Sequence, residues 1–140
     1  MSARNDPKRV TLHCSATPDY KKDDPLFDRY GAGIIHQWHT TRGWNGIGYH
    51  RVIRRTGVIE RGRDDLVIGA GVKGHNRDTI HICLIGTRDF TMEQVQSLIK
   101  LAHEYKQNYM ITDWFGHYEF NERKTCPGVS MNFVRALLAL

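Results

Sequence analysis

The sequence predicts an α/β fold in which a single mixed β-sheet is flanked by helices. The apolar run IHICLIG at residues 80–86 is typical of a central strand that is buried on both faces. Residues 92–107 repeat apolar side chains at helical spacing, and Thr91 followed by Gln94 forms a capping-box pattern at the start of this segment. Strands mixed with helices over this length favour one partly antiparallel sheet that is covered by helices.

The other expected elements are shorter, and turn residues separate them. The segment RVTLHCS at 9–15 reads as a strand with Val10 and Leu12 on one face, and GYHRVIRRTGVIERGR reads as a hairpin. In chain order we expect a strand at 9–15, a loop at 18–27, a helix that begins at Asp28 or Gly31 and ends near Gly43, a hairpin over 48–63, a short strand within 109–116 and a last helix behind Ser130.

Composition indicates one globular domain over residues 1–140. The hydrophobic share of 40% and the charged share of 25% are ordinary for a globular protein, and we find no repeat, linker or apolar run long enough to span a bilayer. The net charge of +5 suits an anionic partner, but the basic residues are scattered. We therefore expect neither nucleic acid nor membrane as a partner, and the N-terminus predicts no secretory signal.

Histidine and cysteine are the residue types that suggest a metal. The chain has eight histidines and three cysteines, with no CxxC spacing. His13 stands near the end of the first strand, while His117 and Cys126 share the segment GHYEFNERKTCPG. Three such ligands would leave a zinc ion one position for water. The spacing also allows a simpler interpretation, in which His13 is an ordinary strand residue and Cys126 a small buried hydrophobe.

Five ordered blocks distinguish these alternatives. They are TLHCSAT at 11–17, QWHTTRGWNGIGYHRVI at 37–53, GRDDLVIGAGVKGHN at 62–76, ICLIGT at 82–87 and KTCPG at 124–128. Together they resemble the type-2 zinc N-acetylmuramoyl-L-alanine amidases, a family that includes phage lysozymes and peptidoglycan-recognition proteins. The resemblance is strongest to small phage lysozymes (endolysins) of the coliphage T-seven type, and it implies an amidase/peptidoglycan-recognition-like fold.

The resemblance implies a site residue by residue. His13, His117 and Cys126 would hold one Zn²⁺ per chain, and Tyr49 and Lys124 would be catalytic. Two histidines and a thiolate leave an open position for a water molecule whose pKa the metal lowers. In an extended segment Lys124 would leave the chain on the same side as Cys126, next to the developing oxyanion. Tyr49 or a zinc-bound hydroxide is the candidate for the general base.

The remaining conspicuous side chains receive weaker interpretations. Trp44 and His75 are candidate substrate contacts, although Trp44 would serve equally well as a core residue between the helix and the hairpin. Cys14 and Cys83 fit small buried hydrophobes, and His50 a structural residue. We expect His36, His39 and His103 on helix surfaces and His81 partly exposed.

The implied activity is hydrolysis of the bond between N-acetylmuramic acid and L-alanine in bacterial peptidoglycan, in the context of a phage endolysin. Such a protein would be made in the host cytoplasm and would reach the wall after a membrane breach, and we expect it to be a monomer. A catalytically inactive recognition module is disfavoured by Cys126, the ligand that such modules lose. A second role, inhibition of a phage RNA polymerase, would involve Arg4–Arg9, although these residues read better as a disordered solvated tail.

Overall fold

The computed structural model of the chain describes residues 4–139, and its centre is a five-stranded sheet in the order β3-β2-β4-β1-β5. The strands are β1 (Arg9–Cys14), β2 (Arg51–Ile53), β3 (Ile59–Arg61), β4 (Thr79–Leu84) and β5 (Trp114–Gly116). β1 runs parallel to β4 and β5, β2 runs parallel to β4, and β3 pairs antiparallel with β2. The prediction of a single mixed sheet is therefore confirmed, and the hairpin over 48–63 is present as β2 and β3.

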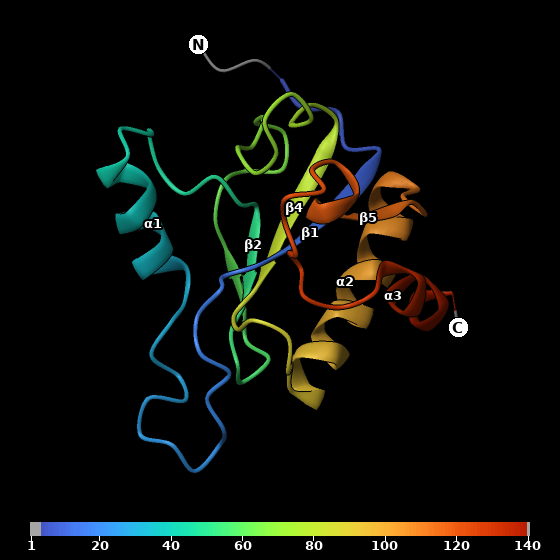
Figure 1. Cartoon of the computed structure of the whole chain (residues 1–140). Helices are drawn as coiled ribbons and strands as arrows, with labels where there is room; N and C mark the ends of the chain where they lie inside the picture. The colour runs from blue at the N-terminus through green and yellow to red at the C-terminus, as the bar shows by residue number, and fades with distance from the viewer. Residues whose placement is uncertain (1–3, 140) are drawn as a thin grey trace.

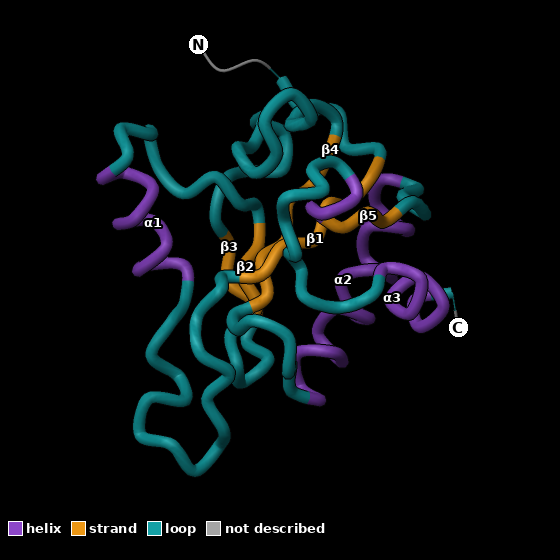
Figure 2. The backbone as a smooth tube through the Cα atoms, in the orientation of Figure 1, coloured by secondary structure: helices purple, strands orange, loops and turns teal. Residues whose placement is uncertain are grey.

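Helices cover the sheet on both sides. They are α1 (Ala32–Thr41), α2 (Met92–Tyr109) and α3 (Met131–Leu138). α1 lies on one side of the strands, and α2 and α3 lie together on the other (Figure 1). Long loops connect these layers, most visibly before α1 (Figure 2). On the α2 side Leu12 and Ile82 pack with Leu98, and on the α1 side Ile35 packs with Cys83.

All six residues of β4 are buried, because β4 has paired strands on both edges and packed side chains on both faces. This position also buries His81, whose exposed fraction is 0%. The expectation that His81 is partly exposed is wrong. A backbone segment that contains Gly69 and Gly71 lies directly over its ring.

The helix ends follow the signals in the sequence. Gln94 N–H donates to Thr91 Oγ1 at 3.1 Å, and Thr91 N–H donates to Gln94 Oε1 at 3.0 Å, which is a complete capping box. Ser130 caps α3 by accepting from Phe133 N–H. α1 begins after Gly31, the second of the two starting points that the sequence predicted.

The N-terminal segment packs against the domain from Arg4 onward. Asn5 is fully buried, and its Nδ2 donates to the carbonyl oxygens of Asp65 at 3.0 Å and Thr79 at 2.9 Å. Arg9 already belongs to β1. The expectation of a disordered solvated tail over Arg4–Arg9 is therefore wrong, because the Asn5 amide forms hydrogen bonds that a sequence pattern does not reveal.

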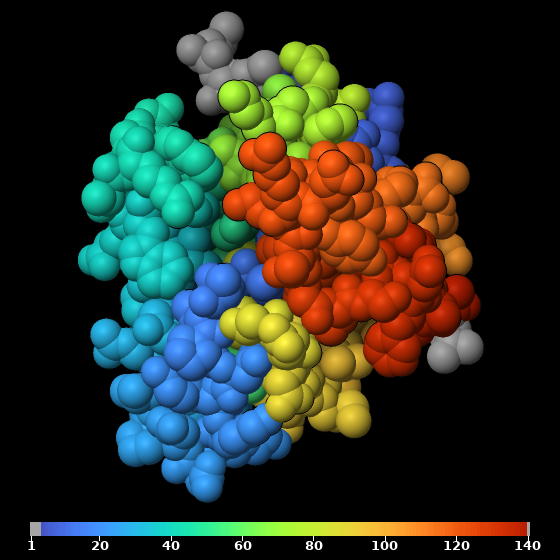
Figure 3. Space-filling model, viewed as in Figure 1, coloured from blue at the N-terminus to red at the C-terminus, as the bar shows by residue number. Residues whose placement is uncertain are grey.

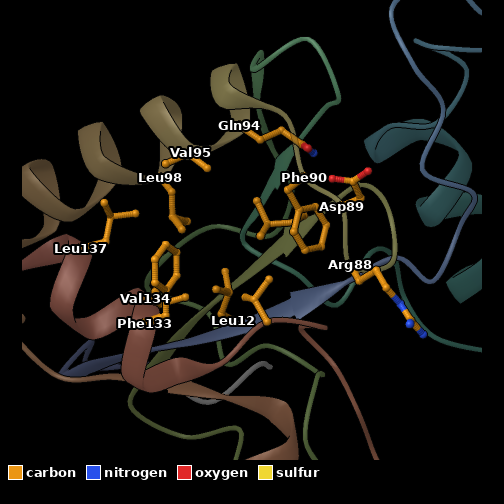
Figure 4. A pocket seen from close by; sticks show the side chains of 12 residues that line it. Leu12, Arg88, Asp89, Phe90, Gln94, Val95, Leu98, Phe133, Val134 and Leu137 are labelled. Carbon is orange, nitrogen blue, oxygen red and sulfur yellow. The ribbon is translucent and has the colours of Figure 1, made fainter.

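An apolar pocket opens between α2 and α3. Leu98 from α2 and Phe133 and Leu137 from α3 line it, with Leu12 of the sheet at its base (Figure 4). None of its lining residues belongs to the histidine and cysteine group described below. Among the described residues, no helix has both the length and the apolar character that a membrane span requires.

Candidate metal centre

Three residues that the sequence singled out come together near the carboxyl ends of β1 and β5. One ligand atom from each of His13, His117 and Cys126 lies within 4.8 Å of the others. The Nδ1 atoms of His13 and His117 are 3.2 Å apart. Among the described residues this is the only His, Cys, Asp or Glu group found with the spacing of a metal site.

Strand pairing explains why such distant residues meet. β1 and β5 are parallel, and Leu12 lies opposite Gly116, so the next residues are His13 in β1 and His117 directly after the end of β5. His117 begins a short 3-10 helix, and Tyr118 N–H donates to the Cys126 carbonyl oxygen at 2.9 Å. This hydrogen bond holds the loop that carries Cys126 beside the 3-10 helix that His117 begins.

The donor set fits a divalent cation such as zinc. Two nitrogen ligands at ~2.0–2.1 Å from a tetrahedral zinc ion lie about 3.3 Å apart, close to the geometry of this pair. The Cys126 Sγ atom also accepts a hydrogen bond from Cys14 N–H at 2.7 Å, which orients the sulfur. Two imidazoles and one thiolate leave a fourth position free for water or substrate.

Burial keeps both imidazoles in the form that binds metals. The pKa of His13 is lowered well below its ordinary value, first by desolvation and then by the neighbouring His81 and His117. The pKa of His117 is lowered by desolvation and by the positive charge of Lys124. Both rings are therefore neutral near pH 7, and each has a lone pair available for a cation.

Tyr49 lies beside the metal ligands. Its ring centroid is 5.0 Å from that of His13, and the side chain lines the cavity that leads to Cys126. Desolvation raises the pKa of Tyr49 well above its ordinary value. Its hydroxyl group therefore keeps its proton near pH 7 and can donate a hydrogen bond into the cavity.

Lys124 also lines this cavity, but not in the way that the sequence suggested. The prediction assumed an extended segment, whereas Lys124 N–H donates to the Asn121 carbonyl oxygen at 2.9 Å and Gly128 N–H donates to that of Thr125 at 2.8 Å. The segment thus consists of consecutive turns. The exposed Lys124 side chain reaches the cavity from a loop, so the structural assumption was wrong while its proximity to Cys126 is retained.

The cavity is open to solvent between α1 and the loop after β5, where the surface is hollowed (Figure 3). Trp44 lines it with 37% of its surface exposed, so the alternative of a core tryptophan is wrong. His75 is exposed and stacks on Phe120 at 4.8 Å, but it is not among the lining residues. Its role in substrate binding stays a prediction.

Sequence reasoning missed several residues around this cavity. Three further cations line it, namely Arg42, Lys73 and Arg123. His39, expected on a helix surface, is only 5% exposed, and its Nδ1 accepts from Gly48 N–H at 2.9 Å. That hydrogen bond holds the segment just before Tyr49. A histidine on the α1 face next to Ile35 was the available signal, because i and i+4 share a helix face.

The fold and the site together are those of a hydrolase: a His/His/Cys group that could hold a metal ion lies at a solvent-open cavity, with a phenol and a lysine beside it. The chain belongs to the N-acetylmuramoyl-L-alanine amidase family, whose profile matches residues 3–129. As a member of this family the chain is an amidase, which hydrolyses the amide bond of N-acetylmuramoyl-L-alanine. Members are typically zinc-dependent, and the His13, His117 and Cys126 group could hold such a metal.

Known relatives agree with this assignment. The endolysin of Escherichia phage T7 is 34% identical over 130 residues, which cover 87% of this chain and 81% of the relative. The solved amidase LysC from Clostridium intestinale is 28% identical with a TM-score of 0.81, covering 97% of this chain and 87% of that one. The solved ectodomains of peptidoglycan recognition proteins LCa and LCx, 24% identical with a TM-score of 0.77 and covering 91% and 81%, share the fold. The predicted amidase/peptidoglycan-recognition-like fold is thereby confirmed.

Proposed function

We propose that this amidase is zinc-dependent, that it holds one Zn²⁺ through His13, His117 and Cys126, and that it cleaves the bond between N-acetylmuramic acid and L-alanine as a phage endolysin. The observation that carries the proposal is the convergence of these three ligand atoms within 4.8 Å, where His117 and Cys126 line an open cavity. The similarity to phage endolysins supports the biological context.

A zinc ion bound there would polarise the amide carbonyl and lower the pKa of a water molecule. The protein's own residues supply the remaining stabilisation. As the carbonyl carbon gains a bond to the water oxygen, the carbonyl oxygen becomes an oxyanion that needs donors or positive charge. Tyr49 offers a phenolic O–H from the buried side of the cavity, and Lys124 offers an ammonium group from the loop side.

The proton balance assigns Tyr49 a donor role. When the C–N bond breaks, the amine of L-alanine must gain a proton that the attacking water loses. Because burial keeps Tyr49 protonated, it is unsuited to take that proton and well suited to hydrogen-bond the oxyanion. Tyr49 was one of the two candidates for the general base that the sequence left open. Its raised pKa argues against that role.

The cavity rim suits a wall fragment that carries carboxylates. Arg42, Lys73 and Arg123 join Lys124 around it, and the ring of Trp44 is available for stacking on sugar or peptide. We propose Trp44 as a substrate contact on this basis. His75 remains a candidate outside the cavity lining, next to Phe120.

The proposed context has consequences for location and partners. An endolysin is made in the host cytoplasm and acts on the wall after the inner membrane has been breached, and we propose that course for this chain as a monomer. Sedimentation analysis would check the monomeric state. Inhibition of a phage RNA polymerase stays a prediction, which a pull-down with the purified polymerase would check. Because Asn5 is packed against the domain, fewer N-terminal residues are free to bind a polymerase than the sequence suggested.

Mass spectrometry of digested peptidoglycan tests the bond assignment. Zinc-loaded protein should release stem peptides with a free L-alanine amino group, and treatment with a chelator should stop the release until zinc is restored. Cleavage within the sugar strand or between stem amino acids would refute the assignment.

Cys126→Ser tests the metal assignment. The variant should lose bound zinc and wall cleavage together, because a serine hydroxyl is a much weaker zinc ligand than a thiolate. The exposed His103 on α2 provides a control, since His103→Ala should keep both. Full zinc content in Cys126→Ser would eliminate the proposed ligand set.

A further inference from the structure

A third histidine lies directly behind the candidate metal centre. His81 is fully buried in β4, and its Nδ1 atom lies 2.8 Å from Nε2 of His13. The strand register places Thr11 opposite His81 and Cys83 opposite His13, so the two histidines project from the same face of the sheet. His13 therefore turns one ring nitrogen toward the proposed zinc site and the other toward His81.

The two nitrogens of His13 have different tasks. A neutral imidazole carries a single N–H, and the nitrogen that binds a cation must be the unprotonated one. Nδ1 of His13 faces Nδ1 of His117 at 3.2 Å, so the proton of a metal-bound His13 belongs on Nε2. That N–H is buried and needs an acceptor, and Nδ1 of His81 lies at hydrogen-bond distance.

We propose that His81 is a positioning residue of the metal centre: its Nδ1 accepts the hydrogen bond from His13 Nε2–H and so fixes the tautomer and ring orientation of His13. This inference rests on the proposed function, because it requires that His13 holds the cation. His81 does not line the cavity, so it acts through His13 and not on the substrate. Hydrogen-bond partners behind a metal-binding histidine set its orientation and raise its basicity.

His81 is itself held from its other side by His50. The backbone N–H of His81 donates to Nδ1 of His50 at 2.9 Å, and the backbone N–H of His50 donates to the His81 carbonyl oxygen at 2.8 Å. Nε2 of His50 then donates to the Val67 carbonyl oxygen at 2.8 Å. The two rings stack with an angle of 6° between their planes and 5.8 Å between their centroids. Contacts within the protein therefore hold the His81 ring in its plane, and no metal ion is needed for this.

Two glycines allow the backbone to cover this pair of rings. A Cβ atom at Gly71 would lie 2.5 Å from His81 Nδ1 and 2.8 Å from His13 Nε2, and one at Gly69 would lie 2.7 Å from His81 Cδ2. Asn76 holds the covering segment, because its Oδ1 accepts from Gly71 N–H at 2.9 Å. The His13–His81 hydrogen bond is thereby shielded from solvent.

The second ring nitrogen of His81, Nε2, gives a reason to doubt that the residue is purely structural. With Nδ1 as acceptor, the proton of His81 lies on Nε2, and this buried atom has no hydrogen-bond partner among the described residues. A buried N–H without a partner opposes folding. An apolar side chain would fill this place in the core without an unpaired N–H. The hydrogen bond to His13 therefore explains the histidine better than core packing does.

Two variants of similar size test the proposal. In His81→Asn the amide oxygen takes the place of Nδ1 and can accept from His13, whereas His81→Leu fills the same space without an acceptor. Zinc affinity is measured for each by competition with a chromophoric chelator. We expect His81→Leu to bind zinc about 10–100-fold more weakly than the wild type, and His81→Asn to stay within about threefold. Equal zinc affinities for the two variants would overturn the proposal, whether both fell or neither did.

A measurement on the wild type keeps the test valid if His81→Leu does not fold. Nitrogen-15 NMR of histidine-labelled, zinc-loaded protein should show His13 protonated at Nε2 and His81 unprotonated at Nδ1. The reverse protonation pattern would overturn the proposal. A wrong ligand set would give a different result from a wrong role for His81. If the ligand set were wrong, Cys126→Ser would bind zinc as tightly as the wild type.

Discussion

Gly71→Ala should disturb the metal centre from a position that contributes no ligand. The added Cβ would lie 2.5 Å from His81 Nδ1 and 2.8 Å from His13 Nε2. Ordinary contact begins at 3.4 Å, so the nearer ring must yield by about 0.9 Å. Both rings are fully buried and joined by a 2.8 Å hydrogen bond, so neither can move alone.

The expected cost is that of an overpacked core. We expect the free energy of unfolding of the metal-free protein to fall by about 1–3 kcal/mol, which lowers the melting temperature by roughly 3–9 °C. Zinc affinity should fall by about 10–100-fold, because His13 is displaced from its partner. Calorimetry and chelator competition measure the two effects.

Gly33→Ala is the matched control, since a Cβ there meets nothing within 4 Å. Because Gly33 lies within α1, alanine should leave zinc affinity unchanged and raise stability by about 0.5–1 kcal/mol. If Gly71→Ala kept the stability and zinc affinity of the wild type, the reasoning would be refuted. The Cβ atom would then fit beside the two rings without displacing them.

Three further predictions concern the cavity and its support. Tyr49→Phe should lower kcat by about 10²–10³-fold with zinc content unchanged, as expected for loss of an oxyanion donor, and an unchanged kcat would exclude that role. Lys124→Gln should lower kcat while Lys124→Arg retains more of it, and equal rates would show that the charge is unimportant. Desolvation lowers the pKa of His39 from its ordinary 6.5 to about 4, so the unfolded chain takes up this proton first as pH falls. Wild-type stability should therefore drop between pH 6.5 and pH 4, by at most about 3 kcal/mol from this group. His39→Asn, which can still accept from Gly48 N–H, should lack that part of the drop in urea unfolding series; parallel curves for the two proteins would contradict the assignment.

The sequence by itself determined the elements and the chemistry of the site. Apolar spacing and local caps predict α2 and α3, because hydrogen bonds such as Thr91 to Gln94 join residues close in the chain. The order of five blocks around His13, Tyr49 and Cys126 indicated the family before any geometry was known. Such signals are local, and each can be read without knowing which strand lies next to which.

The tertiary structure alone decided which residues support that chemistry. His81 acquires its role because β4 lies between β1 and β2, which places the ring between those of His13 and His50. His39 is buried because α1 packs on the segment before Tyr49. The sequence could not show either relation, since burial and hydrogen-bond partners depend on contacts between segments far apart in the chain, and periodicity reports only a residue's own element.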